Sequence, residues 1–152
     1  MGIMKQPMLA TSEIPNIYED VEYPCLIQPK FDGIRCIAIN GVAYSRKMKP
    51  IPNQFIQEFF SENNLHGLDG ELMIHGDFNK VQSAVMSEDG EPNFYYAVYD
   101  YWDSDQSYKV RAGIYVNKVL ELRQPERVKN TQSILVNTPE SVETELQFFI
   151  DN

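Results

Sequence analysis

Lys30 is the side chain whose neighbours best fit it for nucleophilic chemistry. It is followed at short spacing by Asp32, Gly33 and Arg35. A lysine attacks only as the free amine, so a nucleophilic lysine needs its proton removed or its pKa lowered by burial or by a cationic neighbour. Arg35 could supply that charge, or its planar fork of donors could hold a phosphate or a ribose. The spacing therefore indicates attack by an amine on a phosphorus atom.

The same residues also fit a plain β-hairpin. Asp32-Gly33 lies between the apolar stretches 25–27 and 34–39. Such a dipeptide between two strand-like runs is typical of a turn that joins paired strands. In that interpretation Lys30 is a surface ion without chemistry. On these six residues alone both interpretations stay open.

Three further side chains could take part in such a site. Glu71 follows a glycine in the strand-like run 65–74, and its carboxylate could accept a ribose hydroxyl or bind a hard cation such as Mg2+. Tyr99 lies in the aromatic run 94–102, where one ring could stack on a purine although most rings must pack. Gln28 lies two residues before the lysine, so in an extended segment both side chains point to one face. Taken singly, each has a commoner structural role.

Taken together, the motifs resemble those of covalent nucleotidyltransferases. Residues 30–35 match the Lys-x-Asp-Gly-x-Arg signature, residues 68–72 (LDGEL) are similar to the third motif, and residues 98–101 (VYDY) are similar to the adenine-stacking segment. Residues 44–46 resemble the strand that follows the nucleophile, and residues 6–10 resemble the opening segment. In this order they are most similar to the N-terminal part of the nucleotidyltransferase domain of phage-type ATP-dependent DNA ligases. Their joint presence is more specific than any one motif.

This resemblance implies a catalytic role for Lys30. It would attack the α-phosphate of ATP and form a lysine-AMP phosphoramidate, with Mg2+ near Glu71 stabilising charge. AMP would pass to the 5′-phosphate of a nick in double-stranded DNA, and the adjacent 3′-hydroxyl would then seal the strand.

The resemblance also implies nucleotide contacts for five other residues. Gln28 would read the adenine amino group, where glutamate is often found instead. Tyr99 would stack on the adenine, where phenylalanine is usual, and Glu71 would contact the ribose. Arg35 and Arg46 would lie near the ribose and the phosphates.

The pattern of elements favours an α+β fold with mostly antiparallel sheets and flanking helices, as expected for an incomplete, ATP-grasp-like nucleotidyltransferase domain without an OB-fold. Strands at 34–40 and 42–46 flank Asn40-Gly41, a strong hairpin signal. Asn53 could cap a helix. Its apolar face comprises Phe55, Ile56, Phe59 and Phe60.

The rest of the chain continues the alternation. We expect a strand at 65–74, a short helical turn at 79–86, a helix at 108–123, a strand at 133–137 and a helix that starts at Thr138-Pro139. The residues expected to face the core in these helices are Val81, Val85, Met86, Ile114, Val119, Leu122, Val142, Leu146, Phe149 and Ile150.

Composition indicates one folded domain whose charge disfavours DNA. The chain has 152 residues, of which 43% are apolar, and a net charge of -9. Such a charge repels a phosphate backbone. The hairpin interpretation would gather Lys30, Arg35, Arg46, Lys47 and Lys49 around one site. We therefore expect a protein that holds ATP and Mg2+ but binds nicked double-stranded DNA only weakly by itself.

The remaining sequence features favour the cytoplasm, which would be the host cytoplasm for a phage-encoded protein. Cys25 and Cys36 lie in apolar runs without paired spacing, as expected of buried free thiols. His66 and His75 have no companion cluster for zinc. No run has membrane-spanning length and no signal peptide is evident, so we expect no membrane partner.

Two motifs of the ligase family do not occur in the chain. No Glu-Gly dipeptide is present, and the only Lys-x-Lys is residues 47–49, which come too early. Those lysines would neutralise the triphosphate and the charge that develops at the α-phosphorus. We therefore expect residues 1–152 to be a partial nucleotidyltransferase domain, weak or inactive alone. Its partners would include a missing C-terminal segment and an OB-fold domain.

Two alternatives remain from sequence. One is an RNA ligase or a GTP-using capping-type enzyme, which shares the Lys-x-Asp-Gly core, although the run 77–83 looks more like DNA ligases. The other is a non-catalytic adenine-nucleotide-binding or interaction domain that kept the fold.

Overall fold

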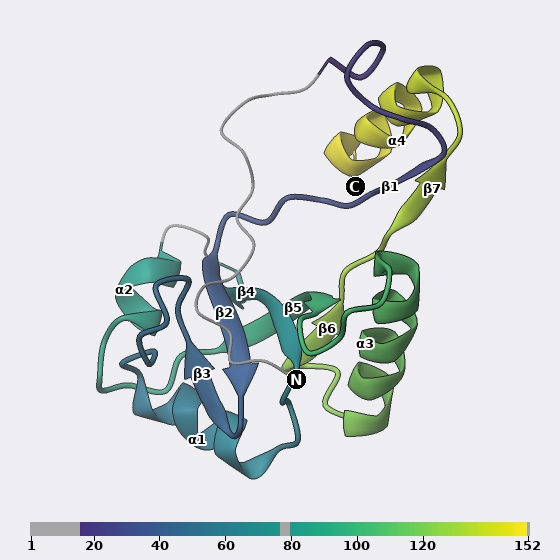
Figure 1. Ribbon diagram of the computed structural model, residues 1–152. Helices are drawn as coiled ribbons and strands as arrows, with labels where there is room; N and C mark the ends of the chain where they lie inside the picture. The colour runs from purple at the N-terminus through teal and green to yellow at the C-terminus, as the bar shows by residue number, and fades with distance from the viewer. Residues whose placement is uncertain (1–15, 77–79, 152) are drawn as a thin grey trace. The chain divides into compact units, whose positions relative to one another are not determined.

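The computed structural model describes residues 16–76 and 80–151, with side chains described as far as Gln147. These residues form two compact units. The first contains Phe31–Asn130, and the second contains the segment that ends at Lys30 and the segment that begins at Thr131. Figure 1 shows the labelled elements of both units.

The first unit is built on a five-stranded sheet with the strand order β3-β2-β4-β5-β6. Neighbouring strands are antiparallel, except for the parallel pair β5 and β6. The strands are β2 (Ile34–Ile39), β3 (Val42–Tyr44), β4 (Leu68–Ile74), β5 (Phe94–Tyr101) and β6 (Val128–Asn130). The expected α+β architecture with mostly antiparallel pairing is confirmed.

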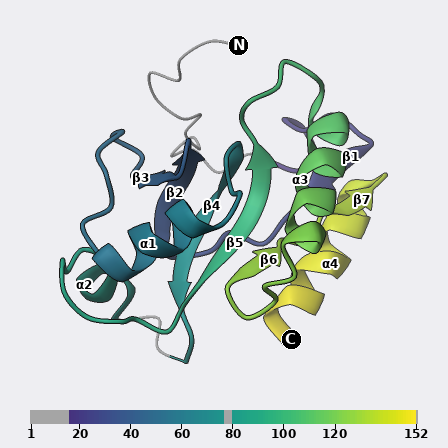
Figure 2. The same ribbon diagram turned by 90° about the horizontal axis from the view of Figure 1, so that it is seen from below.

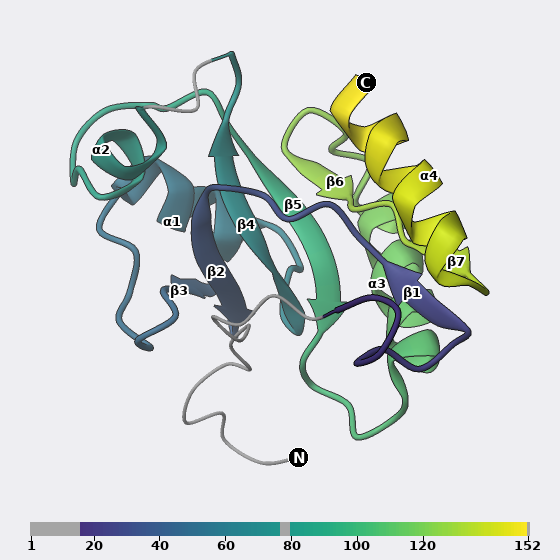
Figure 3. The same ribbon diagram turned by 90° about the horizontal axis from the view of Figure 1, so that it is seen from above.

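Helices α1 (Gln54–Glu62), α2 (Val81–Val85) and α3 (Tyr108–Leu122) contribute to one core on a single face of this sheet. Figure 2 shows α1 and α2 in front of the strands, whereas Figure 3 shows β2, β4 and β5 from the opposite side. Successive strand residues point to opposite faces. Each strand therefore offers one set of side chains to the helices and the other set to the far face.

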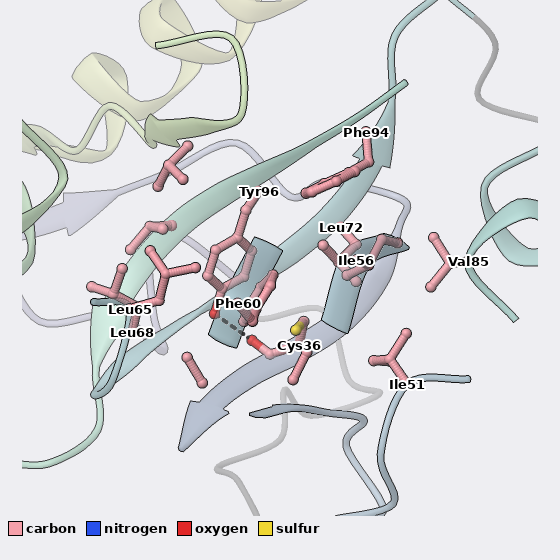
Figure 4. Close-up of a cluster of buried hydrophobic side chains, with 14 of the residues drawn as sticks. Cys36, Ile51, Ile56, Phe60, Leu65, Leu68, Leu72, Val85, Phe94 and Tyr96 are labelled. Atoms are coloured by element: carbon pink, nitrogen blue, oxygen red, sulfur yellow. Dashed lines mark hydrogen bonds between the residues drawn. The ribbon is translucent and has the colours of Figure 1, made fainter. Parts of the chain in front are cut away.

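The core between helices and sheet is aromatic at its centre (Figure 4). The ring of Phe60 on α1 lies 5.2 Å from that of Tyr96 on β5. The buried Tyr96 hydroxyl donates a hydrogen bond of 2.7 Å to the Cys36 carbonyl, which satisfies the one polar atom of that ring. Burial raises the pKa of the Cys36 thiol well above its ordinary value, so this cysteine is an inert part of the core.

Asn53 starts α1 as predicted and also ties down a distant loop. Its Oδ1 accepts the Ile56 N–H at 3.0 Å, while its Nδ2 donates to the carbonyls of Ser87, Asp89 and Gly90. The side chain is fully buried. One residue therefore satisfies groups on two segments, as a buried amide must.

The Asn40-Gly41 hairpin is confirmed. Both residues have positive φ, 48° and 84°, as a type I′ turn requires. β3 ends at Tyr44 and not at Arg46, because a tight turn follows in which the Met48 N–H donates to the Ser45 carbonyl. β4 begins at Leu68 and not at residue 65.

The hairpin interpretation of Asp32-Gly33 is wrong. β1 (Cys25–Ile27) pairs with β7 (Ile134–Val136), whereas β2 belongs to the five-stranded sheet. The segment between β1 and β2 therefore crosses from one sheet to the other. Sequence alone could not show this, because the true partner of β1 is more than a hundred residues away.

Three side chains expected in the core are exposed, namely Met86 (45%), Ile114 (37%) and Leu146 (49%). Met86 follows the last residue of α2, and α3 packs through Tyr115 and Val119. Ile114 therefore lies on a different side of α3 from the packed stripe. β6 was not predicted, and the side chains of Phe149 and Ile150 lie outside the described residues, as do residues 6–10 and 77–79.

The second unit combines the β1–β7 pair with α4 (Pro139–Asp151). Thr138 caps α4 as predicted, since its Oγ1 accepts the Ser141 N–H at 3.2 Å. The Tyr18 hydroxyl donates to Glu143 on this helix at 2.8 Å. Cys25 is half-buried on β1.

Among the described residues, no helix has both the length and the apolar character needed to cross a membrane.

We expect Asn53→Ala to lower the free energy of unfolding by about 2 kcal/mol, because a helix cap and buried carbonyl partners are lost together. Urea denaturation followed by circular dichroism measures this. The control is the exposed Asn64→Ala, which should change stability by less than about 0.5 kcal/mol. Equal effects of the two substitutions would contradict the role given to Asn53.

Candidate functional site

Three neighbouring strands bring polar side chains together on the face of the sheet opposite to the helices. Arg35 lies on β2 directly across from Glu71 on β4. Asp69 lies two residues before Glu71, so both carboxylates point to the same face. Tyr99 on the adjacent β5 contacts both Glu71 and Arg35. Because successive strand residues point to opposite faces, Leu68 and every second residue after it on β4 face the helices. The polar side chains therefore lie next to one another on the other face.

Arg35 and Asp69 form a two-pronged ion pair. Arg35 Nε donates to Asp69 Oδ1 at 2.7 Å, and Nη2 donates to Oδ2 at 2.6 Å. The two side chains are only 15% and 5% exposed. Burial raises the pKa of Asp69, and the hydrogen bonds from Arg35 oppose that rise. The matched fork geometry keeps the pair charged despite its desolvation.

Glu71 receives a hydrogen bond on each carboxylate oxygen. The Gly33 N–H donates to Oε2 at 3.2 Å, and the Tyr99 hydroxyl donates to Oε1 at 3.3 Å. Burial raises the pKa of Glu71, whereas both hydrogen bonds and the charge of Arg35 lower it. The carboxylate is half-buried, so a ligand can still reach it.

Gly33 brings the Lys-x-Asp-Gly segment against β4. A Cβ at this position would collide with the Leu72 carbonyl and with the sulfur of Met73. Only glycine lets the backbone approach closely enough for its N–H to reach Glu71. The glycine of the sequence motif is therefore required by a packing contact.

Tyr99 lies in a β-bulge. Asp69 pairs with Asp100 and Gly70 pairs with Val98, so Tyr99 is an extra residue without a partner on β4. Such bulges re-aim a side chain and are frequent next to functional sites. The Tyr99 ring lies 5.5 Å from the guanidinium carbon of Arg35, within cation–π range. Burial raises the pKa of the Tyr99 hydroxyl, so it serves as a hydrogen-bond donor.

Of the predicted site residues, the structure brings Arg35, Glu71 and Tyr99 together. Arg46 is exposed in the turn after β3. Gln28 and Lys30 belong to the second unit, where Gln28 donates to Ser133 at 2.8 Å and Lys30 is exposed. Their part in the site stays a prediction.

Sequence reasoning missed Asp69 and the Gly33 N–H. The signal for Asp69 was present, because an aspartate two residues before Glu71 in an apolar strand must share its face and needs a cationic partner. No sequence signal shows which backbone N–H binds a carboxylate.

Glu71 fits a hard cation as a single oxygen ligand. Among the described residues, no group of three or more histidine, cysteine or carboxylate side chains could hold a metal ion. Both oxygens of the neighbouring Asp69 are already bound to Arg35. The donor set suits Mg2+, which commonly binds to one or two carboxylates, substrate phosphates and water.

The cluster thus combines groups that suit a ribonucleotide. A carboxylate accepts hydroxyl protons, a guanidinium group binds oxygen anions, and an aromatic ring can stack on a base.

Solved structures of ATP-dependent DNA ligases share this fold. A Chlorella virus DNA ligase-adenylate matches with 31% identity and a TM-score of 0.80, over 93% of this chain and 54% of the ligase. A Lig E DNA ligase matches with 22% identity and a TM-score of 0.72, over 95% of this chain and 57% of that one.

The ATP-dependent DNA ligase of bacteriophage T7 in complex with ATP matches with 18% identity and a TM-score of 0.56, over 79% of this chain and 51% of the ligase. No protein-family model and no curated protein sequence matches the chain. The chain therefore has the fold of the nucleotidyltransferase domain of ATP-dependent DNA ligases, as the motifs predicted, and it spans about half the length of these ligases.

We expect Arg35→Met to lower the free energy of unfolding by about 3 to 5 kcal/mol, because it leaves the Asp69 carboxylate buried without its cation. The double variant Arg35→Met/Asp69→Leu should recover much of this loss. Urea denaturation measures both, and the exposed Arg46→Met serves as control. A double variant less stable than the single one would contradict this account.

Glu71→Gln should stabilise the protein at neutral pH. The pKa of Glu71 is raised in the folded state, so its favourable contribution is present at low pH and is lost as the pH rises through that pKa. An amide stays neutral throughout. In urea denaturation, the stability gained by the variant should therefore grow as the pH rises from the ordinary glutamate pKa through the raised pKa of the folded state, and it should be level above that pKa.

The exposed Glu62→Gln is the matched control for this series and should show no such trend. If the stability gained by Glu71→Gln does not vary with pH, the ionised carboxylate is not the cause of the difference in stability.

Proposed function

We propose that the chain carries the nucleotide-binding part of the adenylation site of an ATP-dependent DNA ligase, with Lys30 as the nucleophile. The observation that carries this proposal is the cluster of Arg35, Glu71 and Tyr99, to which Gly33 of the same signature is hydrogen-bonded. A hairpin with surface ions would give no reason for the signature glycine to bind a half-buried carboxylate on another strand.

The chain itself limits how far Lys30 can lie from this cluster. Three peptide units separate it from Gly33. An extended chain of that length spans at most about 11 Å between Cα atoms. The lysine side chain adds several bonds of reach, so covalent geometry is compatible with the proposed role.

We assign a role to each residue of the cluster and to Gln28 and Arg46, which lie outside it. Glu71 would accept a ribose hydroxyl, and Tyr99, held in the bulge, would stack on the adenine. Arg35 would contact the ribose or a phosphate from its fixed position on Asp69. Gln28 would read the adenine amino group, and Arg46 would contact phosphates.

The proposed reaction begins when Lys30, as the free amine, attacks the α-phosphorus of ATP. A nitrogen–phosphorus bond forms, the bond to the bridging oxygen breaks, and pyrophosphate leaves. The nitrogen proton goes to solvent. Mg2+, bound through Glu71 and the phosphates, would supply neutralising charge.

Nicked DNA would be the acceptor in the intact enzyme. The 5′-phosphate takes AMP from the lysine, the 3′-hydroxyl then displaces AMP, and the strand is sealed. We propose that these steps require the Glu-Gly and Lys-x-Lys segments and an OB-fold domain. The chain alone would adenylate slowly or not at all.

Charge supports weak DNA binding by this chain. Its net charge is -9, yet Arg46, Lys47 and Lys49 are all exposed in the turn after β3. β3 is antiparallel to β2, so it runs toward the end of β2 that holds Arg35. This basic turn would supply the phosphate contacts, which salt would weaken. We keep the cytoplasm as the proposed location.

Incubation with ATP and Mg2+, with the proposed C-terminal segment and OB-fold domain added in trans where the chain alone does not react, should give a covalent adduct of one AMP, detected by mass spectrometry of the intact protein. Lys30→Ala should abolish it, because the proposal assigns the attacking amine to Lys30. The exposed Lys109→Ala is the matched control and should keep it. An adduct that persists in Lys30→Ala would remove Lys30 from the role.

Parallel incubations separate the alternatives. Adduct formation with GTP in place of ATP would favour a capping-type enzyme. Sealing of RNA but not DNA nicks after adding the proposed C-terminal segment and OB-fold domain would favour an RNA ligase. Saturable ATP binding without an adduct, even with those domains present, would favour a non-catalytic binding domain.

A further inference from the structure

The bulge that holds Tyr99 leaves a backbone carbonyl without a strand partner. Tyr99 is absent from the pairing registers of β5 with β4 and with β6, so its carbonyl faces no paired strand residue. A buried carbonyl without a partner costs free energy comparable to a lost hydrogen bond. A group that donates to this carbonyl therefore stabilises the bulge.

Tyr108, the first residue of α3, satisfies this carbonyl. Its hydroxyl donates a hydrogen bond of 2.7 Å to the Tyr99 oxygen. The same hydroxyl lies 3.0 Å from the hydroxyl of Tyr115, a buried residue about two helical turns further along α3. The Tyr108 hydroxyl is therefore held in place by a buried residue of α3.

Arg111 fixes the residue on the other side of the bulge. Its Nε donates to Asp100 Oδ1 at 2.9 Å, and that oxygen also accepts the Tyr101 N–H at 2.7 Å. The Arg111 guanidinium lies 5.4 Å from the centre of the Tyr108 ring. The first turn of α3 therefore holds the backbone at Tyr99 and the side chain at Asp100.

We propose that Tyr108 is a positioning residue of this site, which holds Tyr99 in the bulge and thereby aims its hydroxyl at Glu71 and its ring at Arg35. Tyr108 acts on the site through its hydrogen bond to Tyr99. The geometric claim stands by itself, whereas its consequence for nucleotide chemistry rests on the proposed function.

Tyr96→Phe provides a matched comparison for Tyr108→Phe. The Tyr96 hydroxyl also donates a 2.7 Å hydrogen bond to a backbone carbonyl, that of Cys36, but on the helix side of the same strand. Both substitutions remove one hydroxyl from one carbonyl, and Tyr108→Phe also removes the contact with the Tyr115 hydroxyl. Each should cost about 1 to 3 kcal/mol. Only Tyr108→Phe should disturb the site.

The first readout needs no nucleotide. The Tyr99 hydroxyl lowers the pKa of Glu71 by its hydrogen bond, so Tyr99→Phe should raise that pKa in an NMR titration of the Glu71 carboxyl carbon. Tyr108→Phe should raise it in the same direction, and the double variant should add nothing further. Tyr96→Phe should leave it unchanged.

Two results would overturn the proposal. The first is that Tyr99→Phe raises the pKa of Glu71 but Tyr108→Phe leaves it as it is in the unsubstituted protein. The other is an equal rise in Tyr96→Phe, which would show a general loss of structure. If Tyr108→Phe does not fold, Arg111→Gln takes its place. It should raise the pKa of Glu71 by a smaller amount, and an unchanged pKa would contradict the proposal.

The second readout is the formation of the AMP adduct from ATP, measured where all variants are folded. Tyr108→Phe should slow it about tenfold, as expected for a displaced binding group, and Tyr96→Phe should stay within about twofold. If the Glu71 titration behaves as predicted but no variant forms an adduct, the positioning role holds and the proposed function fails. Equal adduct rates in Tyr108→Phe and the unsubstituted protein would overturn the positioning role in the reaction.

Discussion

The buried ion pair between Arg35 and Asp69 is the interaction on which the rest of the site depends. It joins β2 to β4 by two short hydrogen bonds on the face opposite to the helices. Two charges in such a place are costly unless each meets a partner of matching geometry. Because Asp69 fixes the guanidinium, the same group can lie against Tyr99 and exert its charge on Glu71.

Glu71 shows how this site differs from a simple structural ion pair. Its carboxylate is partly desolvated, which raises its pKa, and its two oxygens accept only an amide N–H and a phenol. A hydrated cation offers a better match for that charge than either neutral group. A half-buried carboxylate whose pKa is raised by burial is typical of functional sites.

Much of the arrangement could be predicted from sequence because it follows short-range rules. Apolar runs predicted the strands that carry Arg35 and Glu71, Asn40-Gly41 predicted one hairpin, and Asn53 marked the start of α1. What failed depended on distant partners. β1 pairs with β7 and not with β2, and the bulge at Tyr99 arises from a register shift that no local pattern signals.

The account holds that a ribonucleotide binds to the face of the sheet formed by β2, β4 and β5. A titration of the isotopically labelled protein with ATP and Mg2+, followed by the backbone amide signals in NMR, tests this most directly. The largest shifts should fall on Gly33, Arg35, Glu71 and Tyr99, with little change at Ile56 or Val119 on the helix side. Shifts confined to the basic turn at 46–49, or to the helix side, would contradict it.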